Sequence, residues 1–491
     1  MQAEHGTTRY HYYVVGEFGK TAAFDRSATS HGKGPDMFGR FLLSSLIALA
    51  LAEAGMSQTR PNFVIFVADD MAWEDCGAYG HPTIQTPHID QLAKEGIRFD
   101  AAFLTCSSCS PSRCSILTGR YPHATGAGEL HQPLPADQLL FTTPLKEAGY
   151  YTASAGKWHL GAPAKSQFDL VKEGGGPGGE GQWVSVLKDR PKNQPFFLWL
   201  AAIDPHRDYK PGAIPKPHQP AEVVVPPIFP DTASVRQDLA LYYDEVSRFD
   251  AGIGAVVAEL ESQGVLDNTF LLIMTDNGRP FPRCKTRVNV DGVKTPFIIR
   301  FPPKVKAGTA TDSLVSSIDI GPTILDLAGV EAPKSLQGVS FQPVLMNPNA
   351  SVREFALAEH NWHDYRAFER AVISRDYLLI KNWIPALQGT PPADAVRSPT
   401  YREMIRLHES DQLDSKLKTL FATPRPEIEL YAWRDDLHCF DNLAQESALQ
   451  MEKQRLLDFL MEWQDRTADI FPGLDRLTPD RFDRVTGQRL Q

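Results

Sequence analysis

The sequence predicts an α/β fold in which helices flank both faces of a large, mostly parallel or mixed sheet, together with a smaller C-terminal α+β domain that has an antiparallel sheet. Three observations support this prediction. Apolar segments of strand length alternate with longer amphipathic segments, polar residues follow the apolar segments at once, and 42% of the 491 residues are hydrophobic. Such a chain can bury a sizeable core, and ligands are expected beyond the carboxyl ends of its strands.

Three buried strands are predicted in the larger domain, and each ends abruptly in polar residues. The strands are residues 63–67, 196–201 and 269–275. They are followed by Asp69-Asp70, Asp204-Pro205-His206-Arg207 and Asp276-Asn277-Gly278, respectively. The polar residues are therefore expected to gather at one edge of the sheet.

The predicted helices begin and end at recognisable signals. One follows Thr86-Pro87 and stops at Gly96, because proline favours the first turn of a helix and glycine its end. A long helix is predicted from about residue 235 to residue 262, closed by Gly264. A strand at residues 296–301 and a helix around residues 317–328 complete the larger domain.

Two segments with many glycines or prolines, residues 172–182 and 211–230, are predicted loops. They are expected to be surface linkers. The alternative is that one or both loops form the rim of a substrate cleft. The segment near residues 347–354 resembles a domain boundary, beyond which residues 370–383 have strand character and residues 444–465 form an amphipathic helix. The predicted organisation is an upstream extension with a signal peptide (1–54), a catalytic α/β domain (55–350) and a smaller α+β domain (351–491).

The charge balance restricts the class of ligand. The formal net charge is -10 at pH 7, which argues against a broad nucleic-acid surface. An anionic substrate would need a local cluster of Lys, Arg and His. We therefore expect no nucleic-acid partner.

One apolar segment, residues 41–52, precedes the α/β domain. It is too short for a stable membrane span of about 20 residues. Arg40 before it and a small-x-small site ending at Ala54 predict a signal peptide. Met37 is then the expected start of translation. Residues 1–36 result either from a start codon assigned too far upstream or from a real, disordered extension. The mature protein is expected to be periplasmic or secreted.

Six cysteines in a chain of this length do not indicate a disulfide scaffold. Three of them, Cys106, Cys109 and Cys114, lie within nine residues, with no second pair or histidine nearby to complete a zinc site.

This cysteine cluster contains Cys109-Ser110-Pro111-Ser112-Arg113, followed by Leu117-Thr118-Gly119-Arg120. The segment resembles the signature of the sulfatase family, and the resemblance extends from about Pro61 to about Ala444. It implies an alkaline-phosphatase-like fold. It also implies that a formylglycine-generating maturation enzyme oxidises Cys109 to formylglycine, whose hydrate is the nucleophile and is steadied by Arg113.

Asp69, Asp70, Asp276 and Asn277 supply four oxygen-bearing side chains at two strand ends. This ligand chemistry suits Ca²⁺ or Mg²⁺ rather than a thiophilic metal. Taken alone, the two pairs are equally consistent with a strand-end turn and a hairpin signal. The family resemblance implies that they are metal ligands, together with the formylglycine at Cys109.

The remaining basic residues also match sulfatase motifs. In Gly156-Lys157-Trp158-His159-Leu160-Gly161, Lys157 and His159 alternate and are expected to project to one side of an extended segment. The resemblance implies that Lys157, His206 and Lys285 contact sulfate, that His206 protonates the leaving group, and that His159 is the base that regenerates the aldehyde. The cationic set then balances charge developing on the sulfuryl group.

Two segments, residues 204–207 and 276–282, resemble the heparan N-sulfatase (sulfamidase) branch. Residues 358–365 of this chain lie where that branch contributes substrate contacts from its smaller domain. The resemblance therefore implies that His363 and Asp364 bind sugar hydroxyls. The alternative is that they pack in the fold or start a helix. The expected function is sulfamidase-like hydrolysis of sulfated glycans. The alternatives are a carbohydrate O-sulfatase, a phosphodiesterase or phosphonate monoester hydrolase of the same fold, and an inactive glycan-binding protein.

Overall fold

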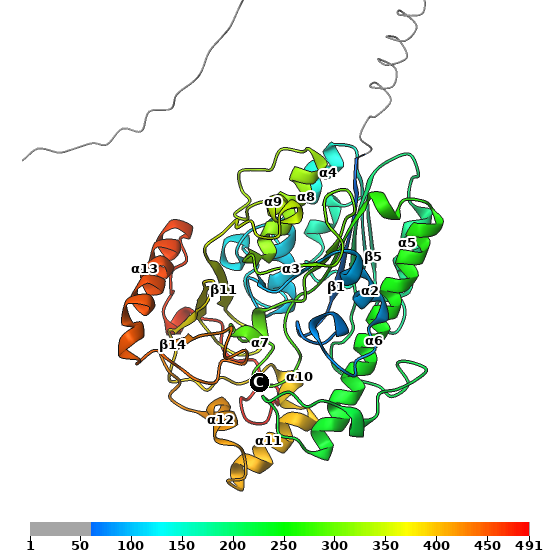
Figure 1. Cartoon of the computed structure of the whole chain (residues 1–491). Helices are drawn as coiled ribbons and strands as arrows, with labels where there is room; N and C mark the ends of the chain where they lie inside the picture. Colours follow the sequence, from blue (N-terminus) through cyan, green and yellow to red (C-terminus); the bar gives the residue numbers. More distant parts are fainter. Residues whose placement is uncertain (1–59, 491) are drawn as a thin grey trace, which may run out of the picture. The chain divides into compact units, whose positions relative to one another are not determined.

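A large mixed sheet forms the centre of the fold, as the sequence predicts, and it has eight strands (Figure 1). Its strand order is β5-β4-β6-β1-β7-β8-β2-β9, and only β8 runs antiparallel to its neighbours. The strands are β1 (Asn62–Ala68), β2 (Ile97–Phe99), β4 (Tyr151–Gly156), β5 (Leu170–Glu173), β6 (Phe196–Ala201), β7 (Thr269–Thr275), β8 (Ile298–Arg300) and β9 (Thr309–Thr311). A separate parallel pair joins β3 (Ala102–Phe103) to β10 (Val315–Ser316).

This computed structural model describes residues 60–490, which belong to one compact unit. The predicted extension and signal peptide, residues 1–54, lie outside the described residues. No helix within residues 60–490 is both long enough and apolar enough to cross a membrane.

Side chains of the central strands alternate between two apolar layers. Phe63 and Ile65 of β1 belong to one layer, and Val64 and Phe66 belong to the other. The first layer includes residues of α3 (Cys109–Thr118), α4 (Thr142–Glu147), α8 (Ile320–Ala328) and α9 (Gln342–Met346). The second includes residues of α2 (Pro87–Glu95), α5 (Trp183–Asp189), the long α6 (Ala233–Ser262) and α11 (Pro399–Glu409). Helices therefore cover both faces of the sheet.

A second, antiparallel sheet follows in the C-terminal part, also as predicted. It consists of β11 (Ala356–His360), β12 (Glu369–Ile373), β13 (Leu378–Asn382) and β14 (Ile428–Tyr431). One face joins the main core, and the other packs against α13 (Gln450–Thr467) through Leu456, Leu460 and Trp463.

Some predicted bounds differ from the structure. The strand character at residues 370–383 belongs to two strands, because the chain turns at Ser374, whose amide donates to Tyr377 O at 2.8 Å. The C-terminal helix begins at Gln450 rather than at residue 444, and a 3₁₀ turn precedes α8. The short helices α7 (Val290–Val293), α10 (Ala393–Val396) and α12 (Ser415–Lys418) have no counterpart in the prediction.

Candidate active site

The register of β1 and β7 brings two acidic strand ends together. The last residues of the two strands pair, so the residues that follow them leave the sheet side by side. The backbone amide of Asp70 donates to Asp276 Oδ1 at 3.3 Å, and Asn277 Nδ2 donates to Asp70 Oδ1. Asp69, Asp70, Asp276 and Asn277 are all fully buried. The four side chains that the sequence singled out therefore form one acidic cluster.

Gly278 permits the close packing that follows this cluster. A Cβ at this position would lie 2.1 Å from Asp291 O, so no side chain fits there. The next strand of the sheet, β8, begins only at Ile298. Asp276-Asn277-Gly278 is therefore a strand end rather than the turn of a tight hairpin.

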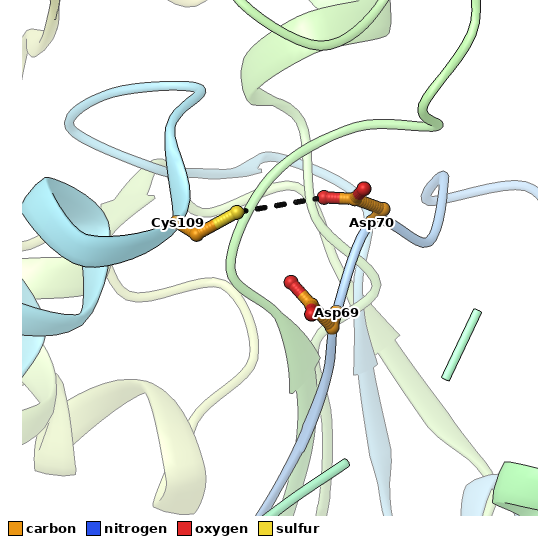
Figure 2. A group of neighbouring side chains, drawn as sticks. All are labelled: Asp69, Asp70 and Cys109. Carbon is orange, nitrogen blue, oxygen red and sulfur yellow. Dashed lines mark hydrogen bonds between the residues drawn. The ribbon is translucent and has the colours of Figure 1, made fainter. Parts of the chain in front are cut away.

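Cys109 is the first residue of α3 and faces the acidic cluster (Figure 2). Its Sγ–H donates to Asp70 Oδ1 at 3.8 Å, and the residue is only 2% exposed. Burial raises the pKa of the Cys109 thiol well above its ordinary value, although Lys157 and Lys285 oppose this effect. The unmodified thiol is therefore protonated and is a poor nucleophile.

Arg113 follows Cys109 by one turn, on the same face of α3. Its Nε donates to Asp276 Oδ2 at 2.7 Å, and its Nη1 donates to Lys157 O at 2.9 Å. Its Nη2 lies 3.7 Å from Asp69 Oδ1. One buried guanidinium group thus connects the helix that carries Cys109 to both strand ends.

Two lysines and a histidine surround the carboxylates. Lys157 Nζ pairs with Asp69, and Lys285 Nζ lies 2.7 Å from Asp70 Oδ2. His206 Nε2 is 3.8 Å from the same Asp70 oxygen. The structure therefore brings together basic residues that come from three distant parts of the sequence.

His159 differs from the expectation. Strand β4 ends at Gly156, and His159 has a φ of 60°, so the chain turns instead of remaining extended. His159 Nε2 shares a 2.8 Å hydrogen bond with Nδ1 of His131, an exposed residue that the sequence analysis did not single out. Burial lowers the pKa of His159 to about 2, and Lys157 acts in the same direction. The imidazole is therefore neutral, and with the site in this state it is only a weak base.

The acidic cluster fits a hard divalent cation. Asp69 Oδ1 and Asn277 Oδ1 are buried and have no hydrogen-bond partner within the described residues. Unpaired buried oxygens are costly, and coordination would satisfy them. Burial alone would raise the pKa of Asp69, but the surrounding cationic side chains lower it, so this carboxylate is ionised. Ligand atoms of Asp69, Asp70 and Cys109 all lie within 4.8 Å of one another.

His363 and Asp364 lie beside the site, and each side chain already has a partner. His363 Nδ1 shares a 2.7 Å hydrogen bond with Oγ of Ser108, the residue before Cys109. Asp364 Oδ2 accepts a hydrogen bond from the backbone amide of Ala393 at 3.0 Å. Asp364 therefore holds the first residue of α10 in place.

Asp394, the second residue of α10, is a site residue that sequence reasoning missed. Its Oδ2 lies 3.8 Å from His206 Nε2 and 3.9 Å from Lys285 Nζ. Burial would raise the pKa of Asp394, but Lys285 and His206 lower it. A short segment with two prolines precedes this residue and matches no functional motif, so only tertiary packing reveals its position.

Other charged residues of the same motifs stabilise the fold. Arg207 forms a 2.8 Å ion pair with Asp238, and Arg248 pairs with Asp204 at 2.6 Å. Arg279 pairs with Asp75. Of the charged residues in the segment 204–207, His206 is therefore the one that faces the carboxylate cluster.

The fold and the strand-end site define a hydrolase that acts on an anionic group. The sulfatase family model matches residues 61–175 and 182–330, and the model for the C-terminal region of N-sulphoglucosamine sulphohydrolase matches residues 285–385. The chain therefore belongs to the sulfatase family and is a sulfuric ester hydrolase. This confirms the resemblance that the motifs indicated.

Relatives of known activity span most of the chain. Human N-sulphoglucosamine sulphohydrolase is 31% identical over 463 residues, covering 84% of this chain and 92% of the human protein. An ulvan-active sulfatase of Formosa agariphila is 28% identical, covering 82% and 74%, respectively. An N-acetylglucosamine-6-O-sulfatase of Bacteroides thetaiotaomicron is 25% identical, covering 68% and 80%.

Solved structures support the same fold. A protein in complex with its substrate D-glucosamine-2-N,6-O-disulfate has a TM-score of 0.65 and 22% identity, with 84% of this chain and 99% of that chain covered. The phosphonate monoester hydrolase of Agrobacterium radiobacter has a TM-score of 0.64 and 14% identity, with 83% and 96% covered. At these identities the likeness supports the fold alone.

Proposed function

We propose that the protein removes sulfate from sulfated glycans, with N-sulfoglucosamine as the preferred unit, through a formylglycine formed at Cys109. One observation carries the proposal. Cys109 starts a buried helix with its Sγ 3.8 Å from Asp70 Oδ1, and Arg113 on the same helix bonds to Asp276. A nucleophile generated at this position would lie against the metal ligands and the cations at once.

The charges of the site support binding of an anion. Three carboxylates of the acidic cluster face three permanent cations, namely Arg113, Lys157 and Lys285. A bound Ca²⁺ or Mg²⁺, held by Asp69, Asp70, Asp276, Asn277 and the modified Cys109, would supply Lewis-acid activation of the nucleophile and a further positive charge. Lys157, Lys285 and Arg113 would then be free to stabilise the sulfuryl oxygens.

The side chains suit a two-step reaction. One hydroxyl of the formylglycine hydrate loses its proton to a carboxylate of the acidic cluster and attacks sulfur, and the bond from sulfur to the leaving nitrogen or oxygen breaks. His206 donates a proton to the leaving atom. Neutral His159 then accepts the proton of the second hydroxyl, the carbonyl re-forms, and sulfate is expelled. Serine or unmodified cysteine has no second hydroxyl and would retain the ester.

Asp394 supports an amine as leaving group. A sulfamate nitrogen bears a hydrogen, whereas the bridging oxygen of a sulfate ester has none. The Asp394 carboxylate lies 3.8 Å from His206 Nε2, next to the expected leaving atom, and can accept that hydrogen. The likeness to human N-sulphoglucosamine sulphohydrolase agrees with this substrate.

The experiment that tests the proposal measures both the mass of the peptide that contains Cys109 and the sulfatase activity of the protein. The protein is produced with and without a formylglycine-generating enzyme, the peptide containing Cys109 is weighed, and sulfate release from N-sulfoglucosamine is measured. Oxidation at Cys109 and activity should appear together. Cys109→Ala should be inactive, while Cys114→Ala, a change at another buried cysteine of α3, should remain active. Full activity of Cys109→Ala would refute the mechanism.

The second candidate is a carbohydrate O-sulfatase, favoured by the 25% identity to an N-acetylglucosamine-6-O-sulfatase. A direct comparison of N-sulfoglucosamine with 6-O-sulfated N-acetylglucosamine separates the two. Preference for the O-sulfated sugar would select this candidate while leaving the formylglycine mechanism intact.

We also propose that the protein is exported and loses residues 1–54, on the basis of the apolar segment at 41–52. N-terminal sequencing of material from the native host should find a start at Gly55. A start at Met1 or Met37 would contradict export by this signal.

A further inference from the structure

A second cluster of buried charge, the arginine pocket, lies in the C-terminal part of the chain. We define it by Arg287, Arg366, Arg425 and Arg484 together with Glu369 and Asn382. Arg425 Nη1 donates to Glu369 Oε1 at 2.6 Å, and Arg287 Nη1 lies 3.6 Å from the same oxygen. None of these residues belongs to the sulfatase site described above.

The pocket is rich in hydrogen-bond donors that have no partner within the described residues. These are Arg366 Nε, Asn382 Nδ2, Thr390 Oγ1 and Arg425 Nη2, while Glu369 Oε2 is the one such acceptor. Asn382 is 1% exposed, and the Arg425 side chain is 9% exposed. Buried donors without partners are costly, so this donor excess indicates a bound acceptor.

The charges of the arginine pocket also point to an anion. Its four guanidinium groups face three carboxylates, those of Glu369, Glu429 and Asp480, which leaves one positive charge in excess. Burial lowers the pKa of His360, which lines the pocket, to about 3, so this imidazole adds no charge. Burial lowers the pKa of Arg287, and the positive charge of Arg425 acts in the same direction. This lowering is expected for a cation whose charge is not fully neutralised.

The size of the cavity restricts the anion. Its volume is about 20 Å³, enough for one particle of roughly the size of a water molecule. Gly389 covers the arginines so closely that a Cβ there would lie 2.7 Å from Arg287 Nη1. This volume favours a small anion over a sulfate group or a sugar carboxylate with its ring. We propose that the arginine pocket binds one small monovalent anion, with chloride as the prototype.

Two of the chain segments that line the pocket lead to the sulfatase site. Arg287 is two residues after Lys285, and Thr390 is four residues before Asp394. Arg484 Nη1 also donates to Gln388 O at 2.7 Å, which fixes the backbone of the second segment. An anion in the pocket would therefore stabilise the segment that carries Asp394. This role is independent of which substrate the enzyme cleaves.

Bromide substitution tests the binding site directly. Crystals of the full chain are grown with bromide in place of chloride, and anomalous scattering locates the halide. The expected result is one bromide in contact with Arg425 and Asn382. A pocket that contains only water under these conditions would overturn the proposal.

A variant with a built-in negative charge gives a second test. Asn382 Oδ1 accepts from the amide of Ile384 at 2.9 Å, and Asn382→Asp keeps that acceptor while placing a charged oxygen at the Nδ2 position. Wild type and the exposed control Arg402→Gln should melt about 2 °C or more higher in sodium chloride than in sodium isethionate of equal ionic strength. Asn382→Asp should melt at the same temperature in both salts. Equal melting of the wild type in both salts would overturn the proposal.

Discussion

The two sides of the active site differ in how the sequence encodes them. The side that is proposed to face sulfate consists of strand ends and one helix start, with Asp69, Asp276 and Cys109 as examples. The side formed by the C-terminal part of the chain consists of loop residues and the start of the short helix α10, with Asp394 and Asp364 as examples. The first side is built by regular hydrogen-bonded elements, and the second by tertiary packing of an irregular segment.

This difference explains what could be predicted. A buried strand followed by carboxylates is visible in the sequence, and parallel neighbours bring such strand ends together. The pairing of Asp70 with Asp276 therefore follows from local pattern and sheet register. The turn at His159 does not, because a positive φ at a non-glycine residue has no reliable sequence signal. His131 and Asp394 were missed because their partners are distant in the sequence.

The largest effect is expected on the strand-end side. Asp276→Ala removes a proposed metal ligand and also leaves the fully buried Arg113 without its 2.7 Å partner. Bound Ca²⁺ or Mg²⁺ and activity should be lost together, with activity falling at least about 10³-fold. Metal analysis and sulfate release measure the two losses.

The control for this prediction is Asp319→Asn. Asp319 is equally buried and pairs with Arg353 outside the active site, so its variant should lose stability but keep the metal. Stoichiometric zinc in active wild-type enzyme, or active enzyme without metal, would contradict the proposed ligand set.

His206 stands between the two sides and should show the next largest effect. An amine or a sugar alkoxide needs protonation to leave, whereas nitrophenolate needs little. His206→Ala should therefore reduce kcat about 10²-fold more on N-sulfoglucosamine than on nitrophenyl sulfate. Equal losses on both substrates would assign His206 to sulfate binding alone.

Asp394→Asn should have a smaller and more selective effect. The variant keeps the shape of the side chain but loses the charge that faces His206 and Lys285. One charge-assisted hydrogen bond predicts a loss of about 10- to 100-fold in kcat/KM for N-sulfoglucosamine. Hydrolysis of nitrophenyl sulfate should change little, since it offers no N–H at the leaving atom. The same loss on both substrates would show that Asp394 acts only through the charge of the site.

The smallest effect is expected at Asp364, on the C-terminal side of the site. If Asp364 acts by holding α10 through the 3.0 Å bond from the Ala393 amide, Asp364→Ala should lower kcat/KM for the sugar about 2- to 10-fold, the contribution of one ordinary hydrogen bond. Asp364→Asn, which retains an acceptor oxygen, should recover most of this loss.

The double variant Asp364→Ala with Asp394→Asn should lose less than the sum of the two single effects, because both changes act through the position of one carboxylate. Additive losses would instead indicate that Asp364 contacts the sugar itself, as the family resemblance implies, and would make the C-terminal side a direct sugar-binding surface with two carboxylates.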